Sequence, residues 1–239
     1  MKINSNDPNA RGGVRRYLDT VPPEEYLPDT GEVNLLEMSL TGVADLYCSD
    51  KGTIKHRYAE VYEPLINFLC AQQGDNRRTA QLVIAEAGVA CGASLHMWSR
   101  YLPESTIVGY DVRAECANLC KNLDNVKIVI GDPAKMHEPK DAPFDLFIDD
   151  ASHISEQIVE MFKNCWPWVR SGGYYIIEDL GCTYSPSYTE QFRAHFDPAA
   201  VNDRRAILTM MDHLMRCVDL RAEIAEMNYY PQLLVLRKL

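Results

Sequence analysis

Two short apolar runs that end in acids most constrain what this chain of 239 residues can fold into. Each run is rich in β-branched and aromatic residues, which is typical of a strand buried on both faces of a parallel sheet. In open α/β sheets, ligands bind at the carboxyl ends of such strands, so we expect the acids to border a binding site. The two runs with their acids are Phe144-Asp-Leu-Phe-Ile-Asp-Asp150 and Tyr174-Tyr-Ile-Ile-Glu-Asp179.

Strand-like and helix-like segments alternate from residue 82 onward, which predicts parallel strands joined by right-handed crossovers. The last two strand-like segments are separated by a turn, and a hairpin there would add an antiparallel strand at the sheet edge. We therefore predict an α/β fold: a Rossmann-like, doubly wound, mostly parallel seven-stranded sheet with an antiparallel C-terminal edge strand and an N-terminal helical extension. The predicted strands are 82–87, 106–110, 126–130, 144–148, 174–177, 222–227 and 232–238, and the predicted helices among them are 94–101, 114–122, 155–169, 188–196 and 203–218.

The N-terminal part of the chain lacks this alternation. Residues 1–33 are rich in Pro, Gly, Asp and Arg and predict an irregular arm with a short helix at 14–19. Residues 34–48 and 58–72 have the apolar spacing of helices. The predicted parts are therefore an N-terminal arm and helical cap at 1–75 and a Rossmann-like domain at 76–239.

The charge and composition exclude some classes of function. A formal net charge of −10 and an isoelectric point near 5.1 argue against nucleic-acid binding, which needs a basic surface. No run approaches the roughly 18 apolar residues of a membrane helix. The N-terminus lacks the apolar core of a signal peptide, so we expect a cytoplasmic protein with no membrane partner. None of the eight cysteines forms a Cys-x-x-Cys pair, which favours reduced, mostly buried thiols.

The acids at the two strand ends predict a metal site. Three carboxylates in one cleft repel each other unless a cation holds them, and hard oxygen ligands favour Mg²⁺ or a similar divalent ion. We predict Asp150, Glu178 and Asp179 as the metal ligands. Asp149 ranks below Asp150 because it faces the other side of the strand. His153 follows shortly and is placed to take a proton beside the ion, so Asp150 and His153 are the predicted catalytic residues.

The loop after the first strand predicts the cofactor. Its pattern, Glu-x-Gly-x-x-x-Gly, is neither that of dinucleotide binders nor that of a phosphate loop, and an acid there suits a ligand with an ammonium group. Acids also end the next two strands, where they can accept hydrogen bonds from ribose hydroxyls and from an adenine edge. Each acid alone is typical of an ordinary strand-end turn, but an amino-acid head, a ribose and an adenine in this order describe S-adenosylmethionine. The predicted cofactor-binding residues are Glu86, Gly88, Ser94, Asp111, Gly131, Asp132 and Asp150.

These motifs resemble those of class I S-adenosylmethionine-dependent methyltransferases. More narrowly, the chain resembles the metal-dependent sugar O-methyltransferases of antibiotic biosynthesis, of the macrocin, mycinamicin and tetracenomycin-rhamnose type, and the related cephalosporin-hydroxylase-type proteins. Two departures are Ala151, where the family often has Gly, and Cys91 in the glycine loop. The matching segments are Asp50-Lys-Gly-Thr-Ile-Lys-His56, Tyr62-Glu63, Glu86-Ala-Gly-Val-Ala-Cys-Gly-Ala-Ser-Leu95 with Trp98, Asp111, Ile148-Asp-Asp-Ala-Ser-His153, Gly172-Gly173 and Ile177-Glu-Asp179.

The resemblance implies roles for several of these residues. It implies that the three predicted ligand acids bind Mg²⁺ and that His153 is the general base. It also implies that the loop 50–56, with Lys51 and Thr53, helps to close the cofactor site, and that the chain forms a homo-oligomer. His56 in this loop is equally compatible with a solvated position and with a role in the site.

The sequence leaves three functions open. The first is an O-methyltransferase that uses S-adenosylmethionine and Mg²⁺ on a hydroxyl of a sugar or a similar small, glycosylated natural product in secondary metabolism. The second is a catechol-type O-methyltransferase on a phenolic acceptor, and the third is a non-catalytic cofactor-binding partner protein. The loop 50–56 and the Ser-His pair at 152–153 favour the first. The complete set of acids with His153 argues against the third, because a binding module needs no base.

Overall fold

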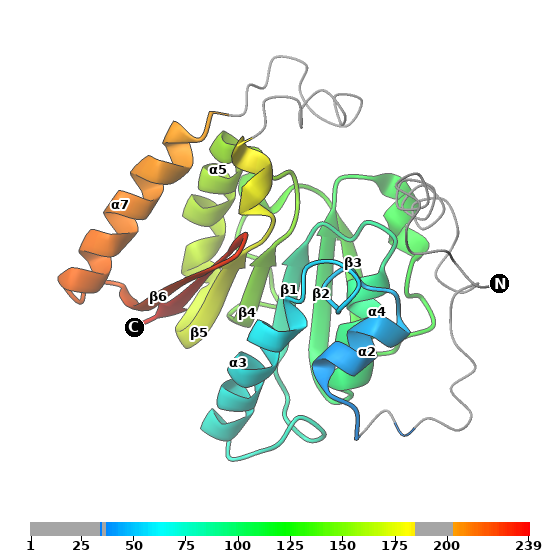
Figure 1. The fold of residues 1–239 in the computed structure, drawn as a ribbon. Helices are drawn as coiled ribbons and strands as arrows, with labels where there is room; N and C mark the ends of the chain where they lie inside the picture. Colours follow the sequence, from blue (N-terminus) through cyan, green and yellow to red (C-terminus); the bar gives the residue numbers. More distant parts are fainter. Residues whose placement is uncertain (1–33, 35–36, 185–202) are drawn as a thin grey trace.

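The structure is a computed structural model that describes residues 34, 37–184 and 203–239 (Figure 1). The predicted helices at 14–19 and 188–196 lie outside these residues. The strands are β1 (Val83–Ala87), β2 (Thr106–Asp111), β3 (Val126–Ile130), β4 (Phe144–Asp149), β5 (Val169–Ile177), β6 (Ile224–Tyr230) and β7 (Leu233–Lys238). Each of the predicted strands is present, and β5 begins earlier than the predicted start at residue 174.

The strands form one sheet in the order β3-β2-β1-β4-β5-β7-β6. Strands β1 to β5 pair in parallel with their neighbours, and β7 pairs antiparallel with both β5 and β6. The chain runs outward from β1 to β3 and then returns to β4 on the other side of β1. Open α/β sheets bind ligands at such a switch point, outside the carboxyl ends of the strands. The predicted sheet, with its antiparallel C-terminal edge, is confirmed.

Helices cover both faces of this sheet (Figure 1). They are α2 (Leu40–Leu46), α3 (Ala59–Gln72), α4 (Ala93–Tyr101), α5 (Ser155–Cys165) and α7 (Arg205–Asp219). Helices α2, α3 and α4 share one core with Ile84 and Ile148, whereas α5 and α7 share another with Ala85 and Phe147. Successive residues of a strand point to opposite faces, so each buried strand contributes to both cores. This explains why the strands are apolar without interruption.

The N-terminal helices are packed into the first of these cores. Val43 of α2 and Tyr62 and Leu69 of α3 are fully buried there, in the same cluster as Trp98. Helix α2 begins at a Ser39 cap, whose hydroxyl accepts a hydrogen bond from the backbone of residue 42. The division of the chain at residue 75 stays a prediction.

The segment predicted as a helix at 114–122 was wrong in length and type. It contains only a short 3₁₀ helix, η2 (Ala114–Asn118), after which Leu119 is extended. Cys120 then adopts a left-handed φ of 61°. Apolar spacing favoured a longer helix, but a left-handed residue cannot continue a right-handed one.

The helix predicted at 155–169 is shorter than its apolar spacing indicates. Helix α5 ends at Cys165, and the chain passes through the 3₁₀ helix η4 (Trp166–Trp168) directly into β5. Pro167 explains the difference, because it has no N–H with which to continue the helical hydrogen bonds.

The described residues include no membrane-spanning helix and no disulfide bond. Every helix among them is too short or too polar to cross a membrane. All eight cysteines lie in this part of the chain, and they are free thiols.

Gly88, the residue after β1, brings the first loop against the end of β4. Its φ of +100° is left-handed, and a Cβ added there would lie 2.1 Å from the carbonyl oxygen of Asp150. The Gly88 N–H also donates to the carbonyl of Tyr110 in β2, at 2.8 Å. A residue without a side chain is therefore required where three strand ends meet.

Gly88→Ala is expected to destabilise the fold. A strained backbone costs about 1–3 kcal/mol, and the contact with Asp150 adds to this because it involves backbone that cannot move aside. Gly74→Ala is the control, because Gly74 has a left-handed φ of +74° but nothing within 4 Å of an added Cβ. Denaturant unfolding of both variants measures the difference. Equal destabilisation by the two substitutions would contradict the packing role of Gly88.

Candidate functional site

The carboxyl ends of β1, β4 and β5 bring Glu86, Asp150 and Glu178 together. The hydrogen-bond ladder continues past the ends of the strands. The Asp150 N–H donates to the carbonyl of Ala87 at 2.9 Å, and the Glu178 N–H donates to the carbonyl of Asp149 at 3.0 Å. Backbone pairing therefore decides which acids face each other.

The side chain of Lys51 lies at the centre of these acids. Its Nζ is 2.6 Å from Asp150 Oδ2, 2.8 Å from Glu178 Oε1, 2.9 Å from Glu178 Oε2 and 3.6 Å from Glu86 Oε1. The Lys51 side chain has no exposed surface. Lys51 is predicted as a cofactor-binding residue, and the structure places its ammonium group against two of the predicted metal ligands.

The acids and Lys51 shift one another's ionisation. Burial alone would lower the pKa of the Lys51 ammonium, but the attraction of Asp150, Glu178 and Glu86 raises this pKa well above its ordinary value. Burial and repulsion from Glu178 raise the pKa of Asp150 well above its usual range. Burial also raises the pKa of Glu178 to about 8, against the attraction of Lys51. The pKa of both acids thus stays raised beside one ammonium group, so the buried carboxyl groups favour a proton or a further cation.

Two tyrosines and a histidine from the N-terminal part of the chain lie against Glu178 and Asp179. The Tyr62 hydroxyl donates to Glu178 Oε1, and the Tyr58 hydroxyl donates to Asp179 Oδ1 at 2.7 Å. His56 Nε2 lies 3.4 Å from the same oxygen of Asp179, and its ring stacks on that of Tyr58. The apolar spacing of the helix predicts both tyrosines as core residues. The missed signal is a pair of hydroxyl-bearing aromatic residues one helical turn apart.

His153 faces the carboxylate oxygens that point away from Lys51 and Tyr58. Its Nε2 is 3.7 Å from Asp150 Oδ1 and 3.9 Å from Asp179 Oδ2. Burial lowers the pKa of His153 to about 4, against the attraction of Asp179. The imidazole is therefore neutral near pH 7 and able to accept a proton. The backbone of His153 has a left-handed φ of 55°, which non-glycine residues seldom adopt.

The predicted metal ligands do not converge on one point. Across residues 34, 37–184 and 203–239, no group of three or more His, Cys, Asp or Glu side chains has the arrangement of a metal centre. Glu178 turns its carboxylate to Lys51, whereas Asp150 and Asp179 each turn one oxygen toward His153. The donor chemistry still fits a hard divalent cation, because one carboxylate oxygen each of Asp150 and Asp179 faces His153 and positive charge would relieve the repulsion among the acids.

The predicted cofactor residues of the first two strands hold the glycine loop. Glu86 accepts hydrogen bonds from the hydroxyl of Ser94 and from Trp98 Nε1, the latter at 2.8 Å. Asp111 Oδ2 accepts hydrogen bonds from the backbone N–H groups of residues 89–90 at 3.0 and 3.2 Å. Both acids thus shape the loop in which a cofactor would lie.

Three other predicted cofactor residues have different surroundings. Thr53 is exposed, and its N–H and hydroxyl bind the carboxylate of Asp45 at 2.6 and 2.7 Å, which ties the loop 50–56 to α2. Asp132 caps the 3₁₀ helix η3 (Pro133–Lys135) with its side chain. Gly131 directly follows β3. Their roles toward a cofactor stay predictions.

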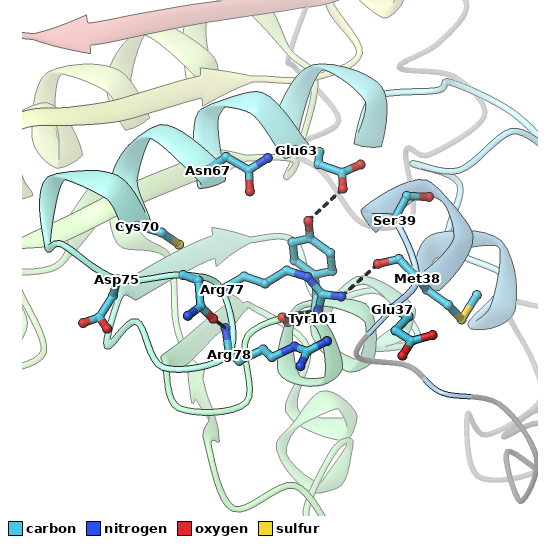
Figure 2. Close-up of a pocket in the computed structure, with 11 residues that line it drawn as sticks. Glu37, Met38, Ser39, Glu63, Asn67, Cys70, Asp75, Arg77, Arg78 and Tyr101 are labelled. Carbon is cyan, nitrogen blue, oxygen red and sulfur yellow. Dashed lines mark hydrogen bonds between the residues drawn. The ribbon is translucent and has the colours of Figure 1, made fainter.

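An open cavity of about 670 Å³ lies away from these acids, beside the residues that precede β1 (Figure 2). The guanidinium of Arg77 lies 4.3 Å from the ring centroid of Tyr101 and donates to the carbonyl of Met38 at 3.0 Å. The Tyr101 hydroxyl donates to Glu63 at 2.9 Å. These polar groups pair with each other and join α3, α4 and the start of α2, so we assign the cavity no catalytic role.

Comparison with known proteins bears out the resemblance read from the motifs. No family model matches the chain. The 8-demethyl-8-alpha-L-rhamnosyl tetracenomycin-C 2'-O-methyltransferase of Streptomyces olivaceus is 33% identical over 158 residues, which are 62% of this chain and 39% of that protein. Demethylmacrocin O-methyltransferase of Streptomyces fradiae is 35% identical over 99 residues, which are 41% of this chain and 25% of that protein. The matched part thus spans less than half the length of these relatives.

The fold is shared with a solved methyltransferase. MycE methyltransferase from the mycinamycin biosynthetic pathway, in complex with Mg, SAH and mycinamycin VI, matches with a TM-score of 0.63 at 21% identity. The match covers 90% of this chain and 62% of that chain. The Rossmann-like fold is therefore confirmed and is shared with this methyltransferase, and the similarity in sequence to sugar O-methyltransferases of antibiotic pathways is confirmed as well.

Proposed function

We propose that this chain is an S-adenosylmethionine-dependent O-methyltransferase that uses Mg²⁺ or a similar divalent ion and methylates a hydroxyl of a sugar moiety in a natural product. The observation that carries the proposal is the position of His153, whose neutral ring faces one oxygen each of Asp150 and Asp179. Removal of a hydroxyl proton beside a cation requires such a base next to such acids.

The acids and His153 have separate tasks in this proposal. Asp150, Glu178 and Asp179 would hold the divalent ion, which supplies positive charge that lowers the pKa of an acceptor hydroxyl. His153 Nε2 accepts the hydroxyl proton, since burial keeps the ring neutral. The Tyr58 hydroxyl orients Asp179 through its hydrogen bond of 2.7 Å. The alkoxide left by proton removal would attack the sulfonium methyl carbon, so that an O–C bond forms while the C–S bond breaks and S-adenosylhomocysteine leaves with the electron pair.

The loops at β1, β2 and β3 would hold S-adenosylmethionine, which supplies an electrophilic methyl group. Glu86 is the acid proposed for its ammonium group and Asp132 the acid for its adenine edge. Asp111 is proposed for the ribose hydroxyls. Burial would raise the pKa of Asp111, but hydrogen bonds from Arg113 lower it, so Asp111 is an anionic acceptor. The remaining proposed contacts are Lys51, Thr53, Gly88, Ser94, Gly131 and Asp150.

The names of the relatives support a sugar acceptor. The Streptomyces olivaceus protein is a rhamnosyl tetracenomycin 2'-O-methyltransferase, and MycE has been solved with mycinamycin VI. Methyl transfer to a glycosylated macrolide or tetracenomycin, compared with transfer to a catechol, tests this part. Transfer to the catechol alone would favour a phenolic acceptor, and cofactor binding without transfer to either would favour a binding protein. We also propose that the protein is a homo-oligomer and that it is located in the cytoplasm. The proposed boundary between the N-terminal part and the Rossmann-like domain is at residue 75.

Removal of the metal or of one ligand charge is expected to stop methyl transfer. EDTA and Asp179→Asn should each reduce turnover by roughly 100-fold or more, because a small ion held by few ligands depends on each charge. Asp212→Asn is the control, because Asp212 is exposed on α7 and paired with Arg216. Its turnover should equal that of the wild type. Full activity of Asp179→Asn in excess EDTA, with the fold checked by circular dichroism, would exclude this metal site.

Loss of the base should affect turnover and leave cofactor binding intact. His153→Ala is expected to reduce turnover by about 10²–10⁴-fold, the usual range for a general base. Because the pKa of His153 is lowered to about 4, the wild-type rate should rise with pH through the acidic range and level off near neutrality. This limb should be absent in the variant. His213→Ala on α7 is the control; near-normal turnover of His153→Ala with a lower melting temperature would assign His153 a structural role.

Asp111→Ala is expected to weaken cofactor binding. The loss of charge-assisted hydrogen bonds to the ribose should cost about 1.5–3 kcal/mol. Calorimetric titration with S-adenosylmethionine measures this, with Asp124→Ala as an exposed control acid in the turn before β3. Lower stability with unchanged affinity would mean that Asp111 serves only the backbone of the glycine loop.

A further inference from the structure

The Lys51 ammonium group binds acids that arrive from different strands. Its contacts are with Glu86 of β1, with Asp150 after β4 and with Glu178 after β5. An ammonium group has three hydrogens to donate, and the two shortest contacts, at 2.6 and 2.8 Å, go to Asp150 and Glu178. Lys51 therefore joins the two strand ends that carry the proposed metal ligands.

The orientation of Asp150 follows from this contact. Asp150 Oδ2 lies 2.6 Å from the Lys51 Nζ, whereas Oδ1 lies 3.7 Å from His153 Nε2. The two oxygens of a carboxylate lie in one plane with their carbon at a fixed angle, so a strong partner for one oxygen sets the direction of the other. Asp179 is arranged in the same way, with Oδ1 bound by Tyr58 and Oδ2 facing His153.

The backbone around Lys51 is held from both sides. Its carbonyl accepts a hydrogen bond from the Ala59 N–H at the start of α3, at 2.9 Å. A Cβ added at Gly52 would lie 2.1 Å from Asp45 Oδ1, so the loop packs closely on α2 as well. The packing of the loop on α2 and α3 thus places the Lys51 ammonium group among the acids. The Lys51 side chain has no exposed surface.

We propose that Lys51 is a positioning residue for the divalent ion. It binds Asp150 Oδ2 and Glu178, and so directs Asp150 Oδ1 toward His153, on the side where the acids would hold the ion. The inference rests on the proposed metal-dependent function and adds to it the residue that orients the ligands. Partners behind the ligands of a metal commonly set its affinity in this way.

Electrostatics distinguishes two roles of Lys51 by the sign of its effect on the affinity for the ion. An ammonium group that merely competed with the ion would lower the affinity for the ion, and its removal would tighten binding. A positioning residue raises the affinity, and its removal weakens binding because Asp150 and Glu178 lose their orientation and repel each other. The direction of the change therefore decides between the two roles.

The test is Mn²⁺ binding to the full chain, measured by the loss of the free-ion paramagnetic resonance signal. Lys51→Met should weaken Mn²⁺ binding by about 10–100-fold, the range found for residues that orient metal ligands. Lys55→Met is the matched control, because Lys55 lies in the same loop but pairs with Asp50 in a half-exposed position. It should bind Mn²⁺ as the wild type does. Unchanged or tighter binding by folded Lys51→Met would overturn the inference, whereas a wild type that binds no Mn²⁺ would overturn the proposed metal site itself.

If Lys51→Met folds poorly, melting temperatures of single and double variants test whether Lys51 is the partner of Glu178. Removal of one partner of a buried ion pair leaves a charge uncompensated, so Lys51→Met should melt well below the wild type. Lys51→Met/Glu178→Gln should recover part of this loss, because the neutral amide needs no cation. A double variant that is destabilised by the sum of the two single changes, or that does not fold, would contradict the role of Lys51 as the partner of Glu178.

Discussion

The contact between the Lys51 ammonium and the buried carboxylates of Asp150 and Glu178 organises the end of the sheet where the acids gather. Parallel strands bring their carboxyl ends to one edge, so acids that end several strands are forced together. A buried carboxylate without a partner is costly, and each strand end depends on a charge that another part of the chain supplies. The fold meets this constraint by packing α2 and α3 on the sheet face beside the acids, where they carry Lys51 inward.

One segment, residues 51–62, supplies partners on one side of the acids: an ammonium group, an imidazole and two phenols. The other oxygens of Asp150 and Asp179 face His153. Burial keeps the His153 ring neutral even beside Asp179, because the loss of solvation of a charged imidazole outweighs the attraction of one carboxylate. The acids therefore have a bound side, which sets their geometry, and a side that faces His153, where we propose that the hydroxyl proton is removed. Because of this division, the proposed proton transfer runs from the acceptor hydroxyl to His153 and not to Lys51 or the tyrosines.

Most of the fold could be predicted because its signals are local. An apolar run and the acids that end it are neighbours in the sequence, and the alternation of such runs with amphipathic segments is sufficient for the order of a parallel sheet. The errors lie where one residue overrides the periodicity around it. Cys120 turns left-handed after η2, and Pro167 ends α5, although the apolar spacing continues past both positions. Pro167 is a local signal in the sequence that ends the helix although the apolar spacing predicts its continuation.

Local patterns were sufficient to place Asp150, Glu178 and Asp179 at neighbouring strand ends and to place His153 beside them. They did not indicate what each acid binds. Lys51 is separated from Asp150 by 99 positions and from Glu178 by 127. The Asp111 carboxylate accepts hydrogen bonds from backbone N–H groups of the glycine loop after β1, and Glu178 turns from the common point that strand order predicts. Such partners depend on how α3 packs against the sheet, and packing between distant segments is set by the whole core and not by the spacing of residues along the chain.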